Sequence, residues 1–169
     1  GRLAASKGVG VLLDAAIAVA ARVPALRLRL VGRDPDGLGS RLVARAAEAG
    51  FADLVELVGP LHGEALVNEL AAADVFAAPS RSEGGPGFTF LEAMACGLPV
   101  IGPSGTGVEE AVIHGDTGLL VPPDDADALA AAIESLLGDR AGREAMGARG
   151  RAHVERVADT RDGMARLEA

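Results

Sequence analysis

Hydrophobic positions recur along the chain with two periods that alternate. Seven segments have the apolar spacing of helices: residues 7–22, 38–49, 63–72, 88–95, 108–113, 124–137 and 140–157. Short apolar runs typical of strands separate most of them: residues 26–31, 54–58, 74–78, 99–101 and 118–121. The alternation predicts βαβ units, a mostly parallel sheet with helices on both faces, and hence a Rossmann-like three-layer αβα fold.

Four of the loops that follow predicted strands contain glycine: residues 32–37, 59–62, 79–87 and 102–107. In open parallel sheets the ligand binds beyond the carboxyl ends of the strands, so we expect it among these loops. The last of them, GPSGTG, lacks the Lys-Ser/Thr of a phosphate-binding P-loop, and we interpret it as a structural turn.

The chain opens with what reads as a loop and a helix, without the strand that a βαβ unit places ahead of them. We therefore expect residues 1–169 to form a single domain whose first strand is missing, as a piece of a longer protein.

The segment SRSEGGPGFTFLEAMACGLPV places a glycine-rich loop directly before a helix. A helix N-terminus attracts anions because its first N–H groups are unpaired and the helix dipole adds partial positive charge. Gly84, Gly85 and Gly87 would let the backbone approach a ligand closely. Phe88 and Thr89 would present the first-turn amides, so the segment predicts an anion site.

Two glutamates flank this loop. Glu92 lies one turn into the helix, where its carboxylate could accept hydrogen bonds from the vicinal hydroxyls of a ribose. Glu83, on the loop side, could meet hydroxyls on another part of the same ligand. An anion between two hydroxylated rings describes a sugar nucleotide.

Three stretches, SRSEG…LEAMACGLPVI, GDTGLLVPP and GRLAASKG, together resemble the C-terminal domain of GT-B glycosyltransferases of family 4, the retaining group called glycosyltransferase group 1. The resemblance runs from residue 1 to about 157 and implies one half of a GT-B fold. It implies a donor-binding domain for a UDP-, GDP- or ADP-sugar, which transfers a hexosyl group to a sugar, lipid or small-molecule acceptor. The acceptor would be held by an N-terminal domain that this chain lacks, so we expect no transfer by residues 1–169 alone.

The resemblance also assigns roles to residues. Arg2 and Lys7 match an Arg and a Lys that contact the donor diphosphate, and Ser6 before Lys7 is a candidate helix N-cap. Glu83 matches a glutamate beside the transferred sugar, and Glu92 one that contacts the ribose. The implied catalytic residues are thus Glu83, Arg2 and Lys7, with phosphate held by the amides that follow the glycine-rich loop.

The sequence departs from the family in one spacing. Residues 84–91 separate the two glutamates, one residue more than usual. Either the extra residue displaces Glu83, or Gly85 and Pro86 bulge and leave both carboxylates in place; we expect the bulge.

The composition restricts which classes of partner and compartment are expected for this protein. A net charge of −8 argues against nucleic acid, which needs clustered cations. No run approaches the ~18 apolar residues of a membrane span, and no signal peptide is visible. A lone Cys96 fits a reducing, cytoplasmic compartment, with a peripheral place at the inner membrane open to a longer protein. The three histidines are scattered, so we predict neither a metal site nor a cofactor other than the donor itself.

Two alternatives remain open. A dinucleotide-dependent Rossmann oxidoreductase needs G-x-G-x-x-G and an acidic residue after the second strand, but here Gly8 and Gly10 are followed by Leu13 in place of the third glycine. A non-catalytic nucleotide-binding or interaction module, derived from a transferase, is supported by the irregular glutamate spacing.

Overall fold

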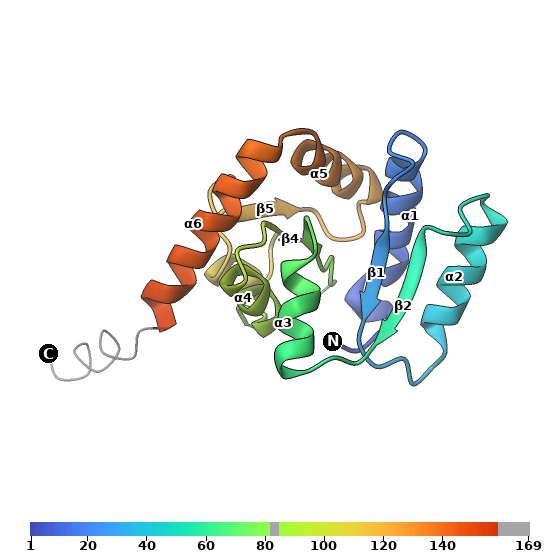
Figure 1. The fold of residues 1–169 in the computed structure, drawn as a ribbon, viewed down its shortest axis with the longest axis horizontal. Helices are drawn as coiled ribbons and strands as arrows, with labels where there is room; N and C mark the ends of the chain where they lie inside the picture. Colours follow the sequence, from blue (N-terminus) through green and yellow to red (C-terminus); the bar gives the residue numbers. More distant parts are fainter. Residues whose placement is uncertain (82–84, 159–169) are drawn as a thin grey trace, which may run out of the picture.

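The structure is a computed structural model that describes residues 1–81 and 85–158 (Figure 1). Its strands are β1 (Leu28–Val31), β2 (Val55–Gly59), β3 (Phe76–Ala77), β4 (Val100–Pro103) and β5 (Gly118–Val121). Its helices are α1 (Val9–Ala20), α2 (Leu38–Glu48), α3 (Gly63–Ala71), α4 (Phe88–Ala95), α5 (Ala126–Gly138) and α6 (Arg140–Ala158). Two short 3-10 helices, η1 (Ala5–Lys7) and η2 (Gly107–Glu110), complete them.

The strands form two parallel sheets, β1-β2 and β3-β4-β5. The predicted parallel α/β architecture is confirmed. The strand that the sequence predicts ahead of the first residue stays a prediction; within the described ranges, no ladder joins β1 to β3.

Neighbouring residues of β4 point to opposite faces of the three-stranded sheet, as the pleat requires. Ile101 packs in a core with helices α1 and α5, which lie against each other. Val100 packs in a second core with α4 and η2, and α4 in turn contacts α6. Figure 1 shows α5 beside α1 and α6 beside α4. Helices therefore cover both faces of this sheet.

The two-stranded sheet is apolar on one face and ionic on the other. Leu30 of β1 is buried with side chains of α1 and α2. Arg29, on the opposite face, pairs with Glu56 of β2 and with Glu69 of α3. The hydrogen bonds from Arg29 hold the pKa of the Glu69 carboxyl below its usual value and so fix its charge. This ion pair links α3 to the sheet.

The segment 108–113, predicted as a helix, differs in the structure. The 3-10 helix η2 ends at Glu110, and the backbone N–H of Ile113 donates to the Thr117 hydroxyl at 2.9 Å. That side chain takes the amide that a continuing helix would have used. The turn before η2 is stabilised by Thr106, whose hydroxyl accepts from the Val108 N–H.

Candidate functional site

The predicted site residues that the structure describes lie on segments at the carboxyl edge of β1 and β3: residues 1–7 run beside the end of β1, and residues 85–92 follow β3. Residues 1–3 extend the edge of β1: the first amino group donates to the Val31 carbonyl at 3.2 Å, and Leu3 N–H donates to the Arg33 carbonyl at 2.8 Å. The Arg33 N–H donates in turn to the Gly1 carbonyl at 3.0 Å. These contacts place Arg2 just beyond the carboxyl end of β1.

The Arg2 side chain is largely exposed and forms an ion pair with Asp36, with an N–O distance of 3.1 Å. It lines a surface hollow together with Arg33 and Pro35. Two arginines thus border this hollow, and the Arg2 guanidinium is already balanced by a carboxylate. An incoming phosphate would compete with Asp36 for Arg2.

Lys7 lies at the end of η1, and the predicted N-cap before it is wrong. The residue that caps α1 is Gly8, with φ at 68°, while Ser6 lies within η1 and its side chain caps nothing. A Cβ on Gly8 would lie 1.8 Å from the Pro79 carbonyl oxygen, so only glycine fits this contact. The closeness of the Pro79 backbone, rather than a hydroxyl cap, decides how α1 begins.

The same contact ties η1 to the segment that leads to α4. The Arg81 backbone N–H donates to the Ser6 carbonyl at 3.0 Å. Lys7 therefore directly follows Ser6, the residue whose carbonyl is hydrogen-bonded to Arg81 ahead of the glycine-rich loop.

Helix α4 begins at Phe88, as the sequence predicts, and Gly87 precedes it. In the described part of the chain, no side chain caps this end. The Phe88 side chain is 79% exposed, and Glu92 is exposed one turn further along. The first-turn amides and the Glu92 carboxylate are thus presented on one short helix of eight residues.

Glu83 and Gly84 lie outside the described residues, so the predicted bulge and the predicted role of Glu83 stay predictions. The described contacts tie the segment of Arg2 and Lys7 to Arg33, after β1, and to Arg81, which precedes the glycine-rich loop.

Three features of this edge were missed from the sequence. Ser80 is buried, and its hydroxyl has no hydrogen-bond partner among the described residues. Arg81 forms an ion pair with Asp124 at 2.9 Å. Glu109 accepts the Gly105 N–H at 2.7 Å, which holds the loop before η2. No local pattern marks the pairing of Arg81 with Asp124, because these residues lie 43 positions apart in the chain.

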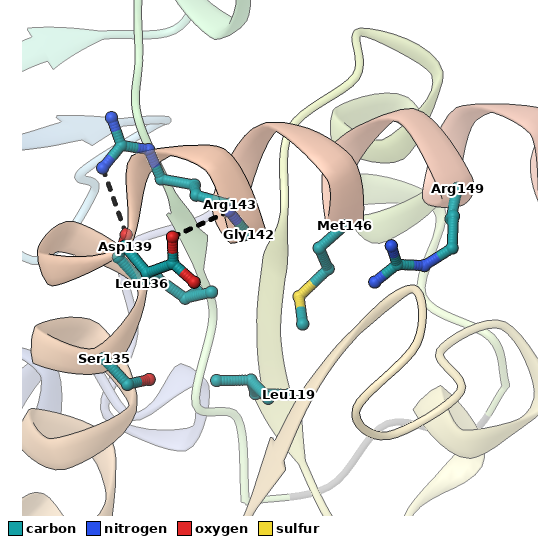
Figure 2. A pocket seen from close by; sticks show the side chains of 8 residues that line it. All are labelled: Leu119, Ser135, Leu136, Asp139, Gly142, Arg143, Met146 and Arg149. Carbon is teal, nitrogen blue, oxygen red and sulfur yellow. Dashed lines mark hydrogen bonds between the residues drawn. The ribbon is translucent and has the colours of Figure 1, made fainter.

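A second hollow lies between α5 and α6 and has a different character (Figure 2). Arg143 crosses it, donating to the Leu136 carbonyl at 3.1 Å and pairing with Asp74 at 2.7 Å. At its other end Arg149 pairs with Asp116. Asp74 and Asp116 precede β3 and β5, so this hollow lies at the amino ends of the strands, away from the predicted site.

The acidic residue that a dinucleotide oxidoreductase would use is engaged elsewhere. Asp34, which follows β1, accepts the backbone N–H groups of Leu38 and Gly39 at 2.7 and 3.0 Å. Both carboxylate oxygens therefore cap α2, which disfavours a ribose contact there.

Within residues 1–81 and 85–158, no cluster of three or more His, Cys, Asp or Glu side chains is arranged to hold a metal ion. No helix in the same ranges is long and apolar enough to cross a membrane.

Comparison with known proteins now decides the family. The profile of "Glycosyl transferases group 1" matches residues 1–139. The chain belongs to this family. A relative from Corynebacterium glutamicum, a GDP-mannose-dependent monoacylated alpha-(1-6)-phosphatidylinositol monomannoside mannosyltransferase, is 40% identical over 91% of the chain.

Solved structures agree with this group 1 assignment. Sucrose-phosphate synthase from Thermosynechococcus elongatus superposes with a TM-score of 0.83 and 36% identity over 99% of the chain, which covers 43% of that protein. Anabaena HepE, solved with UDP and glucose, superposes with a TM-score of 0.84 and 25% identity over all of the chain and 46% of HepE. The Rossmann-like α/β fold is that of a GT-B glycosyltransferase C-terminal domain. The group 1 chain spans about two fifths of these relatives, including 41% of the Corynebacterium enzyme.

Proposed function

We propose that this chain is the donor-binding domain of a retaining glycosyltransferase, which holds a nucleoside-diphosphate hexose and stabilises the departing diphosphate. One observation carries the proposal: the hydrogen bond from Arg81 to Ser6 joins the cation-bearing N-terminal segment to the chain that enters α4. Cationic side chains and unpaired amides then converge on one anion. Electrostatic stabilisation of developing charge is commonly the largest contribution to such catalysis.

Each group has a defined part. Arg2 and Lys7 supply positive charge to the diphosphate, while the amides of Gly87, Phe88 and Thr89 hold its oxygens. The phosphate draws Arg2 away from its exposed partner Asp36 at little cost, because surface ion pairs contribute only about 0–1 kcal/mol. The same amides and cations retain the diphosphate as its bond to the sugar breaks.

The two carboxylates contact the rings of the donor. Glu92 accepts hydrogen bonds from the ribose hydroxyls, and Glu83 contacts the transferred hexose beside the reacting carbon. The acceptor attacks from the face that the nucleotide leaves, and it is held by a second domain in the longer protein.

The choice of donor is narrowed by relatives rather than by this chain's own contacts. The name of the Corynebacterium relative specifies GDP-mannose, and HepE was solved with UDP and glucose. GDP-mannose is a nucleoside-diphosphate sugar, and UDP and glucose are the two parts of another, so we propose that class of donor and leave the base to measurement.

Isothermal titration calorimetry with UDP, GDP and ADP tests the proposal on residues 1–169. We expect weak but saturable binding of one of them and no sugar transfer. NAD and NADP serve as controls and should produce no thermal shift. Absence of heat with all three nucleotides, on protein shown to be folded by circular dichroism, would contradict the proposal.

The irregular glutamate spacing supports the alternative of a non-catalytic module. Glu83→Gln and Glu92→Gln in the full-length protein separate the two. If the protein is a transferase, at least one of the two variants loses sugar transfer. If it is a module that uses neither carboxylate, sugar transfer is unchanged in both variants.

A further inference from the structure

The backbone of Gly85 rests directly on Gly107. A Cβ built on Gly107 would lie 2.6 Å from the Gly85 nitrogen, Cα and carbonyl oxygen, closer than real side chains ever approach a backbone. Gly107 is the first residue of η2, and Gly85 lies just ahead of α4. The bare position at Gly107 therefore lets the segment that enters α4 settle against η2.

The packing around this contact continues into the core through Phe76, Gly87, Phe90, Gly102 and Val108, a cluster that we call the joint. Phe90 of α4 is fully buried and meets Phe76 of β3 edge to face, with ring centroids 5.4 Å apart. Cβ atoms on Gly87 and Gly102 would lie 2.7 and 2.9 Å from the Phe90 ring. Buried Val108 closes the joint, because its methyl group would lie 2.8 Å from a Cβ on Gly102.

We propose that Gly107 is a positioning residue for donor binding: it seats the segment at Gly85 so that the amides of Phe88 and Thr89 are aimed at the diphosphate. This inference rests on the proposed function. The GPSGTG loop, which has no P-loop chemistry, then acts through the shape of its backbone. A methyl group at residue 107 pushes Gly85 outward, and hydrogen bonds from the amides to the phosphate weaken steeply with poor geometry.

The test compares Gly107→Ala with Gly118→Ala. A Cβ on Gly118 would lie 2.7 Å from atoms of Val100 and Val112, which belong to the same core as Phe90. Both variants therefore crowd the packing around α4, but only the Cβ at residue 107 would press directly on the Gly85 backbone. Gly10→Ala, where a Cβ has nothing within 4 Å, is the neutral control.

We expect Gly107→Ala to weaken the best-bound nucleoside diphosphate by about tenfold or more, measured by calorimetry on folded protein. Gly118→Ala should lower Tm without changing Kd, and Gly10→Ala should change neither. Equal losses of affinity in the first two variants, or no loss in Gly107→Ala, would overturn the inference.

A second measurement needs no ligand. Amide hydrogen exchange of the peptide that covers residues 85–91 should be faster in Gly107→Ala than in wild type and unchanged in Gly118→Ala. Unchanged exchange in Gly107→Ala would overturn the inference, whether or not the wild type binds a nucleotide. Failure of the wild type to bind any nucleotide would by itself contradict only the proposed function. If Gly107→Ala does not fold, Val108→Ala loosens the same joint, and unchanged exchange there is equally decisive.

Discussion

The backbone N–H of Arg81 donates a hydrogen bond to the carbonyl oxygen of Ser6, across an N–O distance of 3.0 Å. This contact joins the first turn of the chain to the segment that enters α4. It sets Lys7 beside the segment that follows β3, because the neighbouring Gly8 packs against the Pro79 backbone. The proposed donor site depends on this junction.

Removing either predicted phosphate cation should weaken nucleotide binding. A charged hydrogen bond contributes about 1.5–3 kcal/mol, so Lys7→Ala and Arg2→Ala should each raise the Kd by about tenfold or more. Calorimetry with the preferred nucleoside diphosphate measures the change. Arg140→Ala is the matched control, because Arg140 is highly exposed at the start of α6 and should leave the Kd unchanged.

Glu92 should distinguish ribose from deoxyribose. If its carboxylate accepts from the ribose hydroxyls, Glu92→Ala should weaken the ribonucleoside diphosphate by about tenfold and its 2′-deoxy analogue much less. Competition binding with both ligands gives the ratio of their two dissociation constants. Glu155→Ala, on α6 and paired with Arg151, should preserve the wild-type ratio. A ratio that Glu92→Ala leaves intact would remove the ribose contact from the proposal.

The ion pair between Arg29 and Glu69 should make stability depend on acid pH. Arg29 lowers the pKa of Glu69, so the stabilisation is complete above the unfolded value of about 4.3 and is lost as pH falls through the lower folded pKa. Glu69→Gln should cost about 1 kcal/mol at pH near 7, and the difference should shrink as pH falls from about 4.3 through the lower folded pKa. Thermal unfolding across pH tests this, with Glu64→Gln, an exposed change on the same helix, as control.

Two adjacent aspartates should respond differently to mutation. The Asp125 carboxylate accepts the Ala128 N–H at 2.8 Å and caps α5, so Asp125→Ala should lower stability by about 1 kcal/mol. Asp124 has φ at 59°, a conformation that glycine adopts freely, and its pairing with Arg81 is exposed. Asp124→Gly should therefore change stability by less than about 0.5 kcal/mol. Denaturant unfolding measures the free energy of unfolding of both variants. A larger loss in Asp124→Gly than in Asp125→Ala would contradict this interpretation.

Much of the fold could be predicted because its signals are local. The bounds of α4 and β5 follow from apolar spacing bounded by glycine and proline. The parallel pairing follows from the alternation of strands and helices, and the family follows from three motifs in sequence order. The segment 108–113 was mispredicted, since Thr117 takes the Ile113 amide from outside the segment.

By itself, then, the sequence determined the alternation of helices and strands, the glycine-rich loop before α4 and the chemistry of its flanking side chains, because each depends on residues close together in the chain. Only the tertiary structure decided that Gly8 rather than Ser6 begins α1. The tertiary structure alone decided that the backbone of Gly85 packs against Gly107. These outcomes depend on backbones that approach from distant parts of the chain, and no local pattern records which atoms will meet.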